Sequence, residues 1–235
     1  MKFRTMTFLT AVTLFAVLLQ PVSLVAQNAS SKIISFDVPG AGTTAGSGFG
    51  TFPAGINKAG AITGHFTDAH GLCHGFLRGG AGEEIITFDA PGAGTTAGSG
   101  QGTFPRSVSD SGAITGHYID SHNVTHGFVR SPAGDEIITF DAPGAGITAG
   151  SGFGTFPNSI NDGGAITGRY VDSHNVSHGF LRSSGGKFFV FEVPGAGTTE
   201  GSGGGTFSSN ISDGGTITGR YIDAHDVNHG FLRIP

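Results

Sequence analysis

Tryptophan is absent from this 235-residue chain, cysteine occurs once, and charged residues make up only 12% of it. With Cys73 alone, a disulfide within the chain is excluded. Lysine and arginine total 12 against 17 aspartates and glutamates, for a formal net charge of −5. Because nucleic acids are bound by basic surfaces, this balance argues against a nucleic-acid partner. The lack of tryptophan removes a favoured stacking surface for sugars.

Long apolar runs are also missing, except near the start of the chain. Lys2 and Arg4 precede an apolar stretch over 7–19, and small residues lead to Ala26. This pattern is typical of a secretory signal peptide. We therefore expect residues 1–26 to be a signal peptide and 27–235 to be a single domain. The expected location is secreted, extracellular or periplasmic, with no membrane insertion after cleavage.

Glycine, in contrast, is abundant, with 43 residues, and it accompanies an internal repeat. The phrase Ile-Thr-Phe-Asp-Ala-Pro-Gly occupies 86–92 and returns at 138–144, and looser versions begin at Ile34 and Phe189. The four starts are 52, 52 and 51 residues apart. A period in this range indicates a solenoid, a propeller or an array of repeats.

Each repeat predicts four short antiparallel strands, because β-forming stretches alternate with Gly, Asn, Asp and Ser clusters. Four such strands in about 50 residues resemble the blade of a β-propeller. We therefore predict an all-β, four-bladed propeller with blades at 50–89, 102–141, 154–192 and 205–235. A lone N-terminal strand at 32–38 would complete the fourth blade and close the ring, which removes an exposed edge. An open array of four hairpin-rich units is the alternative.

The motif Asp-x-His-x-x-x-His occurs once in each repeat, and its side chains are of the kind that ligate metals. The two histidines lie on opposite sides of a predicted hairpin turn, so we interpret the aspartate and the second histidine as a structural pair across it. These pairs are Asp68 with His74, Asp120 with His126, Asp172 with His178, and Asp223 with His229. The first histidine lies within the turn and is the better candidate for ligand contact. The four first histidines are His70, His122, His174 and His225.

A second histidine position is not kept through the repeats. His65 and His117 are replaced by Arg169 and Arg220 in the later copies. Since arginine does not substitute for a metal-binding histidine, we expect these side chains to be solvated or stacked on a neighbour.

A long glycine-rich connection joins the fourth strand of each repeat to the next repeat, at 40–50, 92–102, 144–154 and 195–205. It lacks the Lys-Ser/Thr pair and the following helix of a phosphate-binding loop. In an antiparallel meander it emerges on the same face as the Asp/His turns, and function in such folds usually lies on loops. Its threonines could hydrogen-bond a sugar or a peptide. They are Thr43, Thr44, Thr95, Thr96, Thr148, Thr198 and Thr199.

The stretch over 160–172 reads Ile-Asn-Asp-Gly-Gly-Ala-Ile-Thr-Gly-Arg-Tyr-Val-Asp, and His178-Gly179-Phe180 follows it. It resembles the extracellular HAF-repeat family of bacteria, whose repeat has Ile-Asn-Asp-x-Gly-x-Ile-x-Gly-x-Tyr-x-Asp and then His-Ala-Phe or His-Gly-Phe. All four copies match, although this chain has Gly where the family name has Ala. The resemblance implies a secreted bacterial protein with a propeller-like fold and no established activity.

An enzyme site normally breaks repeat symmetry, because its nucleophile, base and orienting group differ. Nearly every polar residue here has counterparts in the other copies. We therefore expect no catalytic residue, cofactor or resident metal, and predict a monomeric, non-catalytic binding module for a glycan or a protein. One alternative is a divalent-metal-binding protein or metal-dependent hydrolase that uses the Asp/His turns. Another is an architectural surface or matrix protein that self-associates.

Overall fold

The computed structural model describes residues 32–80 and 84–235, so the signal peptide expected at 1–26 lies outside the described residues. The chain divides into a unit of residues 1–35 and a unit of residues 36–235. In the first unit, residues 32–35 carry no regular secondary structure. The second unit contains fifteen β-strands and, in its described part, no helix, so the protein is all-β.

Each repeat contributes strands in the same order. The first strands are β1 (Gly50–Ile56), β5 (Gly102–Val108), β9 (Gly154–Ile160) and β13 (Gly205–Ile211). The second strands are β2 (Ile62–Thr67), β6 (Ile114–Ile119), β10 (Ile166–Val171) and β14 (Ile217–Ile222). The third strands are β3 (Cys73–Arg78), β7 (Thr125–Arg130), β11 (Ser177–Arg182) and β15 (Asn228–Arg233). Short fourth strands follow in three repeats: β4 (Ile85–Phe88), β8 (Ile137–Phe140) and β12 (Phe188–Phe191). Within each repeat the pairing is antiparallel, as in β5–β6–β7–β8, which agrees with the predicted meander.

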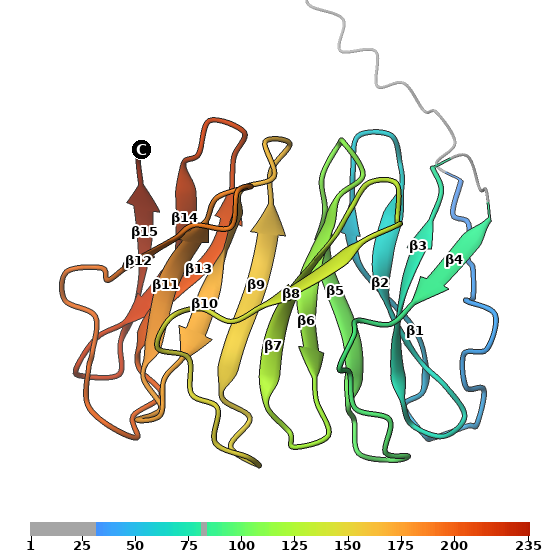
Figure 1. Ribbon diagram of the computed structural model, residues 1–235, viewed down its shortest axis with the longest axis horizontal. Coiled ribbons are helices and arrows are strands. Elements are labelled where there is room, and N and C mark those ends of the chain that lie inside the picture. The colour runs from blue at the N-terminus through green and yellow to red at the C-terminus, as the bar shows by residue number, and fades with distance from the viewer. Residues whose placement is uncertain (1–31, 81–83) are drawn as a thin grey trace, which may run out of the picture. The chain divides into compact units, whose positions relative to one another are not determined.

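The repeats form an open array (Figure 1). The hydrogen-bonded order runs from β1 to β15 in one mixed sheet, in which each repeat meets the next through a single parallel pair such as Cys73 with Gly102. The closed four-bladed propeller was therefore a wrong prediction. The glycine at this junction explains the geometry, because a Cβ atom on Gly102 would collide with the Cys73 carbonyl oxygen. This contact holds successive repeats side by side along a row.

The predicted ring-closing strand at 32–38 was also wrong, because these residues form no strand. Phe36 and Val38 instead lie on the first repeat. The Phe36 ring meets the Phe76 ring edge-on at a centroid distance of 6.1 Å, and Val38 is only 2% exposed. The fourth repeat therefore does not receive this segment within the chain.

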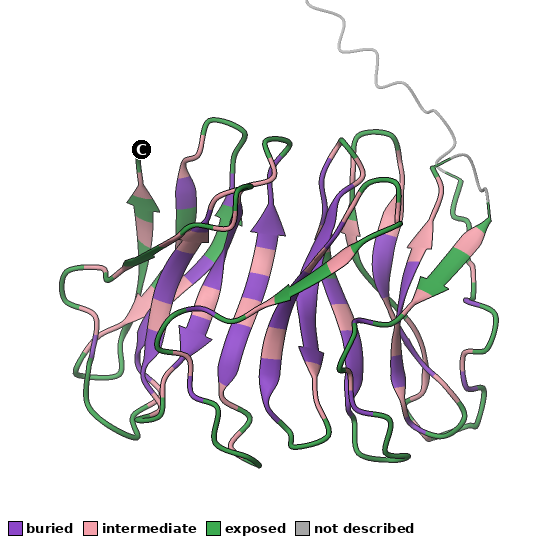
Figure 2. Cartoon of the chain, in the orientation of Figure 1, coloured by how far each residue is buried: buried purple, intermediate pink, exposed green. Residues whose placement is uncertain are grey.

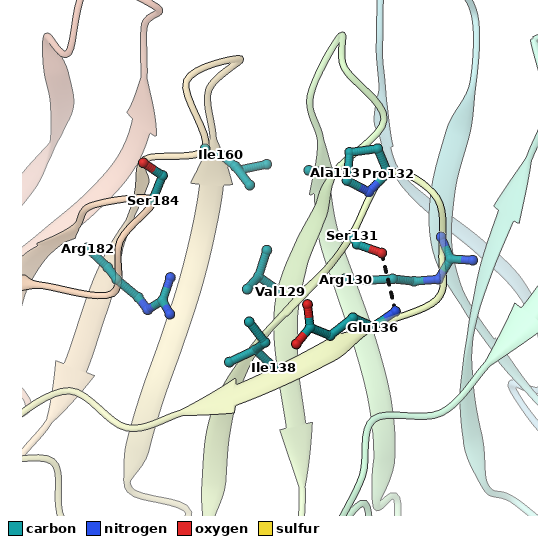
Figure 3. A pocket seen from close by; sticks show the side chains of 11 residues that line it. Ala113, Val129, Arg130, Ser131, Pro132, Glu136, Ile138, Ile160, Arg182 and Ser184 are labelled. Atoms are coloured by element: carbon teal, nitrogen blue, oxygen red, sulfur yellow. Dashed lines mark hydrogen bonds between the residues drawn. The ribbon is translucent and has the colours of Figure 1, made fainter.

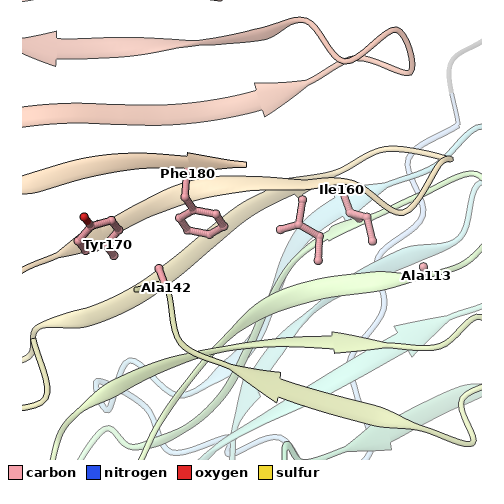
Figure 4. Close-up of a cluster of buried hydrophobic side chains, with 6 residues drawn as sticks. Ala113, Ala142, Ile160, Tyr170 and Phe180 are labelled. Atoms are coloured by element: carbon pink, nitrogen blue, oxygen red, sulfur yellow. The ribbon is translucent and has the colours of Figure 1, made fainter. Parts of the chain in front are cut away.

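The core consists of apolar clusters within and between neighbouring repeats. Figure 2 shows that the buried residues concentrate on the strands in the middle of the array. Phe180, Ile166 and Tyr170 form one of them with residues of the second repeat (Figure 4). Phe180 is fully buried, as are its counterparts Phe76 and Phe128. Buried threonine hydroxyls on the second strands donate to the carbonyl oxygens of these phenylalanines, as Thr167 does to Phe180 at 2.9 Å. Burial of polar groups is tolerated here because they are hydrogen-bonded.

In the described part of the chain, no helix is long and apolar enough to cross a membrane.

Candidate functional site

The glycine-rich connections and the Asp/His turns lie together and form one surface, here called the loop face (the lower side in Figure 1). It comprises the turns at 68–72, 120–124, 172–176 and 223–227 and the connections at 40–50, 92–102, 144–154 and 195–205. Backbone hydrogen bonds join the connections at 92–102, 144–154 and 195–205 to the Asp/His turns at 68–72, 120–124 and 172–176. Gly98 donates to the His70 carbonyl at 2.8 Å, and Gly150 donates to the His122 carbonyl at 2.7 Å. The loops of successive repeats are therefore tied into one continuous surface.

Each Asp/His turn is built around its aspartate. In the second repeat, Asp120 Oδ1 accepts hydrogen bonds from the amides of His122 at 2.9 Å and Val124 at 2.8 Å. Asn123 has a φ of 59°, a left-handed conformation that Asn and Gly tolerate well. Burial alone would raise the pKa of Asp120, but the bonds from Val124 and His122 lower it below its usual value. The ionised aspartate thus acts as the anchor of the turn.

The second histidine is held between two carboxylates. His126 Nδ1 lies 3.0 Å from Asp141 Oδ1, and His126 Nε2 lies 3.6 Å from Asp120 Oδ2. The ring also stacks on Tyr118, with the centroids 4.9 Å apart. The hydrogen bond to Asp141, opposed by burial, raises the pKa of His126. These contacts support the structural interpretation of the second histidine.

The other repeats vary this arrangement. His178 bonds Glu192 and lies 3.2 Å from Asp172 Oδ2, and the bond to Glu192 raises the pKa of His178. In the first repeat His74 bonds Asp89 at 2.9 Å and lies 3.7 Å from Asp68. In the fourth repeat His229 lies 3.3 Å from Asp223.

Asp89, Asp141 and Glu192 were not among the predicted site residues. Each comes 14 or 15 residues after the histidine that it contacts, just past the end of a fourth strand. The signal was present in the sequence, because in the repeated phrase an acidic residue directly follows Phe88, Phe140 and Phe191. Only the antiparallel pairing of the third and fourth strands brings this acid to the histidine.

The first histidines occupy a different environment. The side chains of His70, His122, His174 and His225 are 76%, 72%, 62% and 86% exposed. The threonines of the connections are exposed as well, at Thr43, Thr44, Thr95, Thr96, Thr148, Thr198 and Thr199. The candidate ligand-binding residues therefore share the loop face but spread along it. One hollow of about 150 Å³ brings Thr199 together with Asp223 and Asp226.

Among residues 32–80 and 84–235, no three His, Cys, Asp or Glu side chains are arranged to hold a metal ion. At the Asp/His turns, the positions of the histidine nitrogens explain why no such group forms. In the first three repeats, both ring nitrogens of the second histidine face carboxylates. The first histidine is exposed, and its Nδ1 lies 3.3–3.7 Å from the turn aspartate.

The variable histidine position lies inside the array. Its side chains alternate with phenylalanines in one stack that runs through all four repeats. The stack contains Phe52, His65, Phe104, His117, Phe156, Arg169, Phe207 and Arg220. Burial, together with the charge of Arg106, lowers the pKa of His117 to about 3 and that of His65 to about 4. All four side chains stack on neighbouring rings; His117 is buried, whereas Arg220 in the last repeat is exposed.

A cavity of about 180 Å³ lies between the second and third repeats (Figure 3). Val129, Ile138 and Ile160 line it, with Arg130 and Arg182 at its sides. The turns that border it, at Ser131–Pro132 and at Ser184, are on the side opposite the loop face. None of the candidate ligand-binding residues reaches it.

No protein-family model matches the chain, and no curated protein matches it significantly.

Proposed function

We propose that the protein is a secreted, non-catalytic binding module that holds an extended, hydroxyl-rich glycan along the loop face. One observation carries the proposal. The same exposed imidazole recurs in every repeat, at 62–86% exposure, and in the first three repeats its turn is hydrogen-bonded through the backbone to the next connection. Repeat arrays commonly bind extended ligands along such a surface.

The chemistry of the face favours a glycan over a protein. Its exposed polar side chains are mainly Thr, Ser and His, which donate and accept hydrogen bonds as sugar hydroxyls require. Energetic centres of protein interfaces are enriched in Trp, Tyr and Arg. The tyrosines near this face are instead covered by stacked histidines: Tyr118 and Tyr170 are buried, and Tyr221 is half-buried.

The repetition supports a non-catalytic role. His126 has its counterpart in His178, each with two carboxylates and a stacked tyrosine, so the two sites cannot divide the roles of acid, base and nucleophile between them. The resemblance to HAF repeats is consistent with the proposed extracellular or periplasmic location.

The decisive test is a glycan array with the purified protein, followed by titration of any hit. We expect His122→Ala with His174→Ala to weaken binding at least tenfold and to leave the melting temperature unchanged, because both rings are exposed. Lys187→Ala, on the opposite side of the array, is the matched control and should bind normally. Silence on the array would refute the glycan proposal. If the protein instead bound a protein partner through the same two histidines, the ligand would be a protein and not a glycan, and the loop face would still be the binding surface.

Metal analysis of the same preparation tests the alternative. About one or more zinc ions per chain, with a lower zinc content after Asp120→Asn substitution, would favour a metal-binding protein over the proposed module.

A further inference from the structure

Every internal junction of the array follows one pattern. The third strand of a repeat is covered on its outer side by its own fourth strand and by the first strand of the next repeat. At the first junction, a Cβ atom on Gly75 would come within 2.9 Å of the Phe88 ring and of Pro105. The Phe88 ring in turn meets Phe128 edge-on at 6.1 Å, and Arg130 lies over it at 5.0 Å.

The last repeat exposes this outer side. On β15, Asn228, Gly230 and Leu232 are exposed, and Leu232 is 65% exposed. A Cβ atom on Gly230 would meet only the Gly219 carbonyl oxygen at 4.0 Å, whereas its counterparts are packed against phenylalanine rings. In the described residues, β15 pairs only with β14.

The first repeat exposes the matching half of the same junction. Ile56 on β1 is 68% exposed, whereas the corresponding residues Val108, Ile160 and Ile211 are 5–9% exposed. A Cβ atom on Gly50 would meet nothing within 4 Å, while the same atom on Gly102 would collide with the preceding repeat.

Residues 36–38 already lie on the first repeat as a fourth strand lies on the repeat that follows it. Phe36 meets Phe76 at 6.1 Å and 72°, close to the 6.1 Å and 76° of Phe88 on Phe128. Arg78 lies 5.0 Å above Phe36. The Val38 amide donates to Thr51 Oγ1 at 2.9 Å, as the amide of Ala90 does to Thr103. No strand of the described residues pairs with 36–38, and at the internal junctions the corresponding edge of a fourth strand pairs with a third strand.

The hydrogen-bonding groups at the two ends are complementary too. His229 contacts Asp223 but has no second carboxylate among the described residues, and its side chain is 42% exposed against 18–27% for the other three second histidines. Asp37 follows Phe36 as Asp89 follows Phe88, and Asp37 is exposed. A segment that docks on β15 as β4 docks on β3 therefore brings Asp37 to His229.

We propose that copies of this chain associate head to tail, with β15 of one copy receiving Phe36–Val38 and β1 of the next. Phe36 then pairs with Gly230 as Phe88 pairs with Gly75, and Asp37 supplies the missing carboxylate to His229. The two contact surfaces are different, so the association is heterologous and continues into rings or filaments. It joins the loop faces of successive copies and does not depend on whether that face binds a glycan.

Sedimentation velocity of the purified protein over increasing concentration tests the association. We expect the wild type to form a series of species larger than the monomer. Gly230→Val should remain monomeric with an unchanged circular dichroism melt, because the added side chain meets open space in the monomer and the Phe36 ring in the assembly. Gly185→Val is the matched control on an exposed turn, and it should associate like the wild type.

A mixing experiment tests the direction of association. Asp37→Lys should also be monomeric alone, because it removes the carboxylate that His229 would bond and puts a long cationic side chain in its place. Gly230→Val retains the N-terminal surface and Asp37→Lys retains β15, so their mixture should form dimers and nothing larger. A wild type that stays monomeric into the millimolar range, or a Gly230→Val variant that associates normally, would overturn the proposal. Failure of the glycan array would leave it untouched.

Discussion

Alanine substitution of equivalent phenylalanines in the second and fourth repeats distinguishes an open array from a ring. Phe128 and Phe231 occupy the same position of the His-Gly-Phe strand. Phe128 is fully buried between neighbours on both sides, whereas Phe231 lies in the last repeat and is partly exposed. In a closed ring the two positions would be equivalent, because every repeat would have two neighbours.

The burial sets the expected magnitudes. Replacing a fully buried phenylalanine by alanine costs about 3–5 kcal/mol, because the side chain loses its transfer free energy and leaves a cavity. We therefore expect Phe128→Ala to lower the free energy of unfolding by about that amount. For a domain of this size, each kcal/mol corresponds to about 2–4 °C in melting temperature. Phe231→Ala should cost about half as much or less, since its ring keeps part of its contact with water in the folded state.

The assay is calorimetric and chemical unfolding of both variants in dilute solution, below the concentration at which copies associate. Dilution matters because a second copy would bury the last repeat and equalise the two sites. Equal losses for Phe128→Ala and Phe231→Ala under these conditions would refute the open-array reasoning. A larger loss at Phe231 would refute it as well.

Two further predictions concern titrating groups inside the array. The pKa of His117 is lowered to about 3, so the folded state binds fewer protons than the unfolded chain below pH 6.5, and stability should fall as the pH drops from 6.5 towards 3. At 1.36 kcal/mol per pH unit, the loss in the free energy of unfolding is about 3 kcal/mol at pH 4. His117→Phe should remove this loss, as measured by urea unfolding at each pH. A variant with the same acid dependence as the wild type would contradict the assignment. Asp141→Asn should bring the raised pKa of His126 back towards its ordinary value, because the hydrogen bond that His126 donates to the Asp141 carboxylate is the main cause of the shift. An imidazole NMR titration measures this directly, and an unmoved His126 curve would mean that Asp120 alone sets its charge.

The strands and turns could be predicted from the sequence because their signals are local. Positive φ at Asn123, Asn175 and Asp226 follows from the residue types found at one turn position across the copies. The shared position of the connections and the Asp/His turns follows from the parity of an antiparallel meander. These features depend on residues close together in the chain, so one repeat is enough to indicate them.

The choice between ring and row could not be predicted in the same way. A propeller blade and a unit of this array have the same strand order and the same turns. They differ in how neighbouring units are placed, which depends on contacts between repeats such as Gly102 against Cys73 and Phe88 against Phe128. The second carboxylate of each histidine was missed for a related reason. Asp141 is fifteen residues from His126, and only strand pairing brings the two together.

The open arrangement changes what the loop face can bind. In a ring, four identical turns would surround one axis and would suit a single compact ligand at the centre. In a row, each turn has a neighbour only before and after it, so a ligand that contacts several turns must itself be extended. Binding at a second repeat then occurs at a high effective concentration, and affinity depends on how many repeats the ligand spans. Head-to-tail association of the chains lengthens the same row, which makes the two proposals reinforce each other while each remains testable alone.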